Sequence, residues 1–144
     1  MRSGTNRAAA GLLAACLSVG CTQTDCTAIG AEPGVSFDLR QIVAEESGQV
    51  DVRACVRDVC VEHLASSGRW EIFFINDPSL TGPRTVTVRL VVTSPSGRRI
   101  LDETAEVDVR RFQPNGPGCD PIVSIASVEA TTDGHLESQP VQSD

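Results

Sequence analysis

The sequence predicts an all-β fold, an antiparallel β-sandwich of about seven strands of the immunoglobulin-like or transthyretin-like type, held by disulfide bonds. Apolar and polar residues alternate over short stretches separated by turns, and no stretch has a convincing helical periodicity. Four cysteines accompany these stretches, namely Cys26, Cys55, Cys60 and Cys119. A true immunoglobulin domain is excluded, because the chain has no Tyr to form the tyrosine corner.

Seven stretches are expected to form the strands. They are residues 35–39, 50–56, 59–64, 70–75, 85–92, 101–109 and 122–128. Residues 70–75 are apolar on both faces, so we expect this strand in the middle of a sheet. Residues 41–43 break the alternation of the first strand, which indicates a bulge or the end of that strand.

The most informative element is a predicted hairpin with a two-residue Arg-Asp turn. When Val56 faces Val59 across this turn, Cys55 faces Cys60, with Cα atoms ~4.5 Å apart and within disulfide range. The face that points into the core then consists of Val52, Ala54, Val56, Val59, Val61 and His63. Because Arg-Asp lacks the Asn-Gly chemistry of two-residue turns, a four-residue loop with the same disulfide is the alternative.

A second disulfide follows from the first. If Cys55 pairs with Cys60, Cys26 and Cys119 are left for each other. Their bridge would tie the chain before the first strand to the loop before the last strand. In the chain-entropy picture, closing a loop of ~94 residues stabilises the fold by about 4.7 kcal/mol, and closing one of ~6 residues by about 2.2 kcal/mol. The long bridge is therefore expected to dominate the stability.

Residues 1–20 have the pattern of a secretory signal peptide, with a basic start, an apolar run too short to span a bilayer, and small residues at the end. Cys21 follows directly, which resembles the bacterial lipobox, and we expect Cys21 to be acylated. Cys16 is the alternative, since Leu13 stands three residues before it, whereas Ser18 stands before Cys21. The number of cysteines favours Cys21. If Cys21 is acylated, four cysteines remain to form disulfides, whereas acylation of Cys16 would leave five, one of them unpaired. A secreted chain with an unmodified Cys21 is the third interpretation.

The expected organisation has four parts. They are a signal peptide (1–20), a lipid-anchored tether and turn (21–34), a β-sandwich domain (35–128) and a disordered acidic tail (129–144). Without residues 1–20 the chain has ten arginines against 19 acidic residues, a formal charge of −9. This charge argues against nucleic acid as a partner and against peripheral docking on anionic lipid. It fits a soluble domain anchored by lipid at the extracytoplasmic face of the cell membrane.

The cysteines and turns also follow a known pattern. The similarity lies in Cys26-Thr-Ala-Ile-Gly with Gly34-Val35, Ala54-Cys55-x₄-Cys60 and Gln113-Pro-Asn-Gly-Pro-Gly-Cys119. This pattern resembles small uncharacterised lipoproteins of high-GC Gram-positive bacteria, over nearly the whole mature chain. The resemblance implies an envelope location and no assigned activity. The chain departs from that group at Ala31 and at Ile122 or Val123, where further cysteines often stand, which is consistent with one absent disulfide.

The sequence contains no nucleotide-binding, zinc-protease or hydrolase motif, and we expect no catalytic residue, metal or cofactor. His63 is expected to lie in the core or at its border, and the catalytic alternative, in which it would pair with a nucleophile, is disfavoured. Thr104, Glu106 and Asp108 share one strand face, where they either contribute to a Ca²⁺ site or form a solvated acidic face, and we expect the latter. The Cys55–Cys60 pair is expected to be structural, because its spacing is not that of an oxidoreductase.

These observations predict a non-enzymatic envelope lipoprotein that binds an envelope protein or polymer. The alternative is a lipoprotein that captures a small ligand or ion. An apolar pocket lined by Trp70, Phe73 and His63 would favour ligand capture, whereas a filled core with an exposed strand edge or apolar patch would favour partner binding. The outward arginines form either a basic patch or solvated strand faces, and they are Arg53, Arg57, Arg89, Arg98, Arg99, Arg110 and Arg111.

Overall fold

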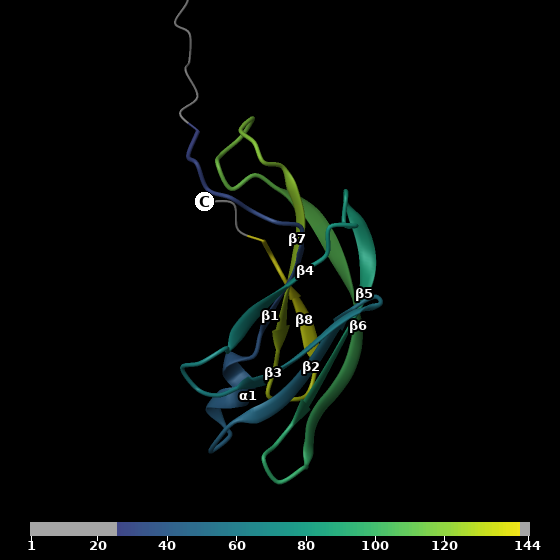
Figure 1. Cartoon of the computed structure of the whole chain (residues 1–144). Coiled ribbons are helices and arrows are strands. Elements are labelled where there is room, and N and C mark those ends of the chain that lie inside the picture. Colours follow the sequence, from purple (N-terminus) through teal and green to yellow (C-terminus); the bar gives the residue numbers. More distant parts are fainter. Residues whose placement is uncertain (1–25, 142–144) are drawn as a thin grey trace, which may run out of the picture.

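The computed structural model describes residues 26–141 (Figure 1). The strands are β1 (Gly34–Asp38), β2 (Val50–Val56), β3 (Val59–Ala65), β4 (Ile72–Asn76), β5 (Arg84–Thr93), β6 (Arg99–Phe112), β7 (Val123–Ala130) and β8 (Leu136–Gln139). One short helix, α1 (Arg40–Ala44), follows β1. All seven predicted strands are present close to their expected ranges, so the all-β prediction is confirmed.

The strands form one curled sheet in the order β3-β2-β5-β6-β7-β1-β4, with β8 paired to β7, and the sheet nearly closes into a barrel-like shape (Figure 1). The purely antiparallel arrangement that we expected is wrong at one place, since β1 and β7 run parallel. Parallel neighbours need a long crossover connection. Here that connection contains β2 to β6, which is why no local pattern could reveal it.

Strand β6 connects the two halves of the curled sheet. Its residues up to Val109 pair with β5, whereas Arg110–Phe112 pair with β7. The β6–β7 loop (113–122) therefore lies at one end of the molecule. The turn between β5 and β6, Ser94–Arg98, lies at the opposite end (Figure 1).

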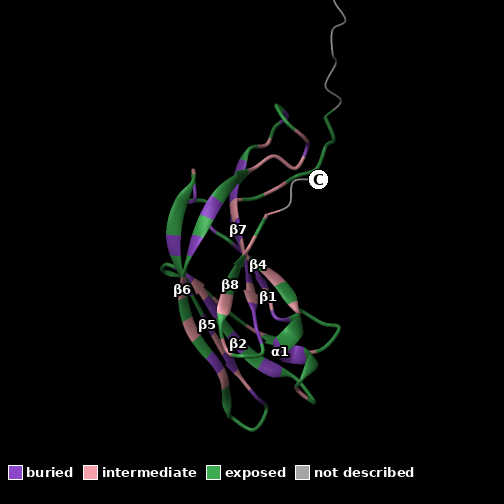
Figure 2. Ribbon diagram, turned by 180° about the vertical axis from the view of Figure 1, so that it is seen from behind, coloured by how far each residue is buried: buried purple, intermediate pink, exposed green. Residues whose placement is uncertain are grey.

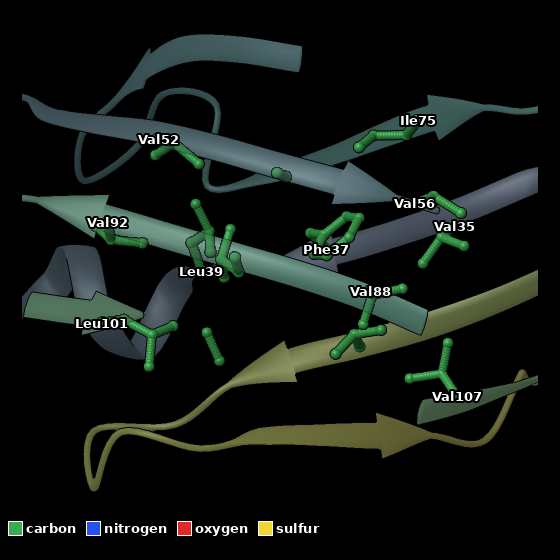
Figure 3. Close-up of a cluster of buried hydrophobic side chains, with 14 of the residues drawn as sticks. Val35, Phe37, Leu39, Val52, Val56, Ile75, Val88, Val92, Leu101 and Val107 are labelled. Atoms are coloured by element: carbon green, nitrogen blue, oxygen red, sulfur yellow. The ribbon is translucent and has the colours of Figure 1, made fainter. Parts of the chain in front are cut away.

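The core lies inside the curled sheet, where buried positions alternate along the strands (Figure 2). The buried side of β5 consists of Val86, Val88, Leu90 and Val92. Apolar side chains from opposite strands converge on the centre, where Phe37 is fully buried (Figure 3). Because aromatic residues make up only 3% of the chain, Val, Leu and Ile supply most of this packing.

The β2–β3 hairpin has the predicted register. Val56 pairs with Val59 and Cys55 with Cys60 across a two-residue turn, and the two cysteines form a disulfide with Cα atoms 4.1 Å apart. The turn residue Arg57 has a φ of 52°, in the left-handed region that Asn and Gly usually supply in such turns. The inward face is fully buried along β2 but only half-buried or exposed along most of β3.

The expected placement of residues 70–75 in the middle of a sheet is wrong. Strand β4 pairs only with β1 and lies at the end of the strand order. Its side chains Phe73 and Ile75 face the core, whereas Ile72 and Phe74 are exposed. The hydrophobicity of both faces therefore reflects an apolar surface and not burial between two layers.

Of the two expectations for residues 41–43, the bulge is wrong, whereas the first strand does end just before them, at Asp38. These residues lie in α1, a single helical turn that buries the adjacent side chains Ile42 and Val43. Two neighbours in a strand would point to opposite faces, so a helical turn is the local geometry that buries both.

The disordered tail expected for residues 129–144 also needs correction. Strand β7 continues to Ala130, and β8 pairs with it in an antiparallel hairpin. The Thr131 N–H donates to the His135 carbonyl oxygen at 3.0 Å across a turn in which Gly134 has a φ of 88°. Residues 142–144 lie outside the described chain.

The segment before β1 is fixed to the β6–β7 loop. A disulfide joins Cys26 to Cys119, with Cα atoms 5.7 Å apart. Beside it, the buried Asn115 Oδ1 accepts hydrogen bonds from the Thr27 hydroxyl (2.9 Å) and the Ile29 N–H (2.7 Å), and its amide group donates to a loop carbonyl. One covalent bond and one buried amide thus hold this segment in place.

Candidate functional site

Strands β3 and β4 are the two ends of the strand order, yet they lie side by side where the curled sheet nearly closes. β3 pairs only with β2, and β4 only with β1. A single backbone bridge, between Ser66 and Arg69, lies in the turn that joins them. We call this junction between β3 and β4 the seam. Within the described chain, the facing edges of the two strands have no ladder of backbone hydrogen bonds.

Aromatic side chains close the inner side of the seam. The His63 ring on β3 meets the Phe73 ring on β4 edge-on, with centroids 4.1 Å apart. Phe73 in turn stacks on the buried Phe37 of β1 at 5.2 Å. Burial lowers the pKa of His63, and its buried Nε2 has no hydrogen-bond partner in the described residues. His63 therefore packs here as a neutral, largely apolar ring.

An ion pair closes the far end of the seam. Arg57, in the β2–β3 turn, donates to the carboxylate of Asp77 and to the hydroxyl of Ser79, directly after β4. Burial of Asp77 acts to raise its pKa, but hydrogen bonds from Ser79 and Arg57 outweigh this effect and hold the pKa below its ordinary value. Asp77 is thus a carboxylate at neutral pH, and the link stays ionic.

Most of the exposed large apolar side chains lie around the seam, on both faces of β3 and on the outer face of β4. Five belong to β3, β4 or the turn between them, namely Val59 (40% exposed), Leu64 (48%), Trp70 (60%), Ile72 (50%) and Phe74 (44%). We call these five residues the apolar rim. Among the described residues, the other two exposed large apolar side chains are Ile29 and Ile122. Clustering on one junction distinguishes the rim from scattered surface residues.

One rim residue leads into an apolar hollow. Phe74 packs over Gly34 on β1, where a Cβ would collide with the β4 backbone and come within 2.6 Å of the Phe74 ring. Beside Phe74 lies an open hollow of about 660 Å³, lined also by Phe112, Ile125 and residues 30–32. The glycine therefore lets the ring lie flat, at the border between rim and hollow.

The pocket that would favour ligand capture is not formed by the described residues. His63 and Phe73 fill the space between themselves, and Trp70 is exposed on the outside. The interior is occupied by the hydrophobic core. What the structure presents instead is a filled core with an exposed strand edge and an apolar patch, the combination that favours partner binding.

The acidic face of β6 is occupied by neighbouring hydroxyl groups. The Thr87 hydroxyl donates to Glu106 at 2.5 Å, and the Thr85 hydroxyl donates to Asp108 at 2.9 Å. Thr104 lies on the same exposed face. In residues 26–141 no group of three or more His, Cys, Asp or Glu side chains is placed to hold a metal ion.

The outward arginines do not form one basic patch. Five of the seven take part in ion pairs, which are Arg53–Glu62, Arg57–Asp77, Arg89–Asp102, Arg98–Glu46 and Arg99–Asp102. Arg110 and Arg111, near the β6–β7 loop, have no ion-pair partner in the described part of the chain. Arg69 in the β3–β4 turn and Arg84 at the start of β5, which are not among these seven, also have no ion-pair partner in residues 26–141.

The predicted modification site lies outside the described residues. This applies to Cys21, to the alternative Cys16 and to the whole signal peptide. The four cysteines that the structure describes are all present in the two expected disulfides.

A comparison with known protein families, characterised proteins and solved structures found no match to this chain. None of the helices within residues 26–141 is long and apolar enough to cross a membrane. Function has to be inferred from the residues themselves.

Sequence reasoning missed two buried polar residues that position this site. The Asp77 carboxylate accepts a hydrogen bond from Arg57 at the end of the seam. Asn115 accepts one from the Ile29 N–H and so fixes the segment before β1. Both stand beside Pro or Gly, so the sequence indicated turns at both places. Nothing local to either residue shows that it is buried, because each partner lies far away in the chain.

Burial of neutral His63 predicts a loss of stability in mild acid. The unfolded chain binds a proton at His63 below the ordinary pKa of 6.5, whereas the folded chain binds it only at lower pH. The free energy of unfolding should therefore fall as the pH drops through 6.5. Urea titrations at about pH 7.5 and about pH 5.5 should show a smaller drop for His63→Gln than for the wild type, and equal drops would contradict this.

Proposed function

We propose that this protein is a non-enzymatic lipoprotein of the cell envelope that binds a protein partner. A diacylglyceryl group on Cys21 would hold it at the extracytoplasmic face of the membrane. The residue pattern at the N-terminus supports the anchor. The disulfides support it as well, because all the cysteines from Cys26 onward are paired and Cys21 is left without a structural task. We also propose that the fold is a β-sandwich, in which the two halves of the curled sheet that β6 connects are the two layers.

The seam is the surface that we assign to the partner. An exposed strand edge is a template for a further strand, whose backbone groups hydrogen-bond to the free edge. The apolar rim lies beside the free edges of β3 and β4. A strand added there would therefore also bury its own alternating apolar side chains against the rim. The single observation that carries this proposal is the concentration of exposed apolar side chains on the junction between β3 and β4, which has no strand pairing.

The chemistry of the rim favours a protein segment over a polysaccharide. Four of its five side chains, Val59, Leu64, Ile72 and Phe74, have no hydrogen-bonding group. A sugar chain needs donors and acceptors for its hydroxyl groups, whereas an extended peptide supplies the backbone groups that a strand edge requires. The expected partner is thus an envelope protein with an extended segment in which apolar residues alternate.

Site-specific photo-crosslinking in cells that export and anchor the full chain tests this proposal. A photoreactive phenylalanine replaces Ile72 or Leu64 on the rim, and a matched control carries it at Thr104 on the exposed acidic face. We expect one discrete protein adduct from each rim position and none from the control. Introducing Phe74→Asp should abolish the adducts, because a carboxylate would have to be desolvated beneath the partner strand.

Three outcomes would contradict the assignment. They are no adduct from either rim position, adducts of equal yield from position 104, and rim adducts that persist with Phe74→Asp. Adducts to an envelope polymer instead of a protein would overturn the choice of partner. The anchor is judged separately, from the mass of the same purified chains.

A further inference from the structure

The structure determines which end of the domain faces the proposed lipid anchor. Cys26 is bonded to Cys119 in the β6–β7 loop, and Asn115 binds the same segment through Ile29. Cys21 is five residues before Cys26, and a chain of that length spans at most roughly 18 Å even when fully extended. The end of the domain that contains residues 26–30 and 113–122 is therefore kept beside the membrane, and we call it the anchor end.

The anchor end, which would lie beside the membrane, carries exposed apolar side chains. Ile29 is 55% exposed and Ile122 is 53% exposed, and these are the two that do not belong to the apolar rim. Ile122 shares an open cleft with Arg111, Phe112 and Pro117. Figure 1 shows the segment before β1 and the β6–β7 loop side by side at this end, away from the turn between β5 and β6.

The charge at this end differs from that of the rest of the domain. The chain as a whole is acidic, with a formal net charge of −7. Arg110 and Arg111 lie beside the β6–β7 loop and have no ion-pair partner in the described residues, whereas Asp120 is the one acidic residue of the loop. Phosphate groups at a lipid surface would attract these arginines and repel the acidic remainder of the domain.

We infer that the anchor end is a second membrane contact, which docks on the phospholipid bilayer in which the lipid anchor resides. Ile29 and Ile122 enter the boundary between headgroups and acyl chains. Arg110 and Arg111 point to opposite faces at the end of β6 and reach the lipid phosphates from either side of the strand. Such a contact is too small to recruit a free protein, but the tether raises its local concentration at the surface, so a weak contact is populated. The inference rests on the proposed anchor at Cys21.

Docking at this end would orient the domain. Strand β6 has 14 residues, a length of roughly 40 Å, and runs from the turn between β5 and β6 to the anchor end. The turn at Ser94–Arg98 would then stand far from the bilayer. If the domain moved freely on its tether, its two ends would not differ in this way in their distance from the bilayer.

Tryptophan fluorescence of the full acylated chain in phosphatidylcholine–phosphatidylglycerol vesicles tests the inference. In a Trp70→Phe background, which removes the one native Trp, a new Trp is introduced by Ile29→Trp or Ile122→Trp. The matched control is Ser96→Trp, in the exposed turn at the opposite end. Lipids brominated along their acyl chains quench only a Trp that reaches the acyl boundary.

We expect quenching at positions 29 and 122 to exceed that at position 96 by threefold or more, together with a blue-shifted emission. Equal quenching at the two ends would overturn the inference. Flotation of the same vesicles separates this failure from failure of the anchor. A chain that floats but shows equal quenching is anchored without docking, whereas a chain that does not float with the vesicles contradicts the proposed lipoprotein itself.

Discussion

Replacing Cys26 and Cys119 together by alanine is expected to lower the free energy of unfolding by about 4.7 kcal/mol, because the bridge joins two residues that are 93 positions apart in the sequence. This figure is the loop-closure contribution, which comes from the greater freedom of the unfolded chain. The bridge also holds the segment whose backbone binds the buried Asn115, so the folded state should lose those hydrogen bonds in addition. Urea unfolding, monitored by far-UV circular dichroism, measures the difference.

The double variant Cys55→Ala with Cys60→Ala is the matched control. It removes the same number of sulfur atoms, but its bridge spans a separation of only 5 residues. The expected loss is about 2.2 kcal/mol. Equal losses for the two double variants, or a larger loss for the short bridge, would show that loop closure does not set the stability of this domain.

Phe73→Ala is expected to cost about 3 kcal/mol of folding free energy, at the lower end of the usual range because the ring is only partly buried. The substitution removes the stacking on Phe37 and the contact with His63, which together close the inner side of the seam. The cavity would lie between β1, β3 and β4, where no backbone hydrogen bonds between β3 and β4 compensate. Chemical denaturation of the purified variant provides the value.

The neighbouring residue supplies the control. Phe74 points to the opposite face of the same strand and is 44% exposed, so Phe74→Ala should cost about 1 kcal/mol or less. It should nevertheless weaken partner crosslinking at the rim. If Phe74→Ala destabilised the fold as much as Phe73→Ala, the outer face of β4 would be a structural surface and not a binding one.

Local patterns were sufficient to predict the hairpin of β2 and β3. The pairing of Val56 with Val59 determines every other pair, and only this register brings Cys55 opposite Cys60. Alternating hydrophobicity likewise located β1, β5 and β6. In each of these cases the information lies within a few neighbouring residues.

The position of β4 could not be predicted in the same way. A strand that is apolar on both faces is read as central, yet Ile72 and Phe74 are exposed. Which strand lies at the end of a sheet depends on pairings such as β1 with β7, which join residues about 90 positions apart. The seam and its ion pair between Arg57 and Asp77 were hidden for the same reason.

Strand β8 was missed because its composition is polar. Its residues, Leu-Glu-Ser-Gln, have low strand propensity and resemble a solvated tail. The available signal was the Asp133-Gly134 pair before it, a strong short-range indicator of a hairpin turn. The edge of β7 then provides the backbone partner that fixes the strand.

The intact mass of the protein extracted from native membranes tests the lipid-anchored, disulfide-stapled domain most directly. The mass is determined without reduction and again after reduction and alkylation. We expect a chain that begins at a diacylglyceryl Cys21 and has four further cysteines that are labelled only after reduction. An unlipidated chain, a chain that begins at Cys16, or a free thiol at Cys26, Cys55, Cys60 or Cys119 would contradict this expectation.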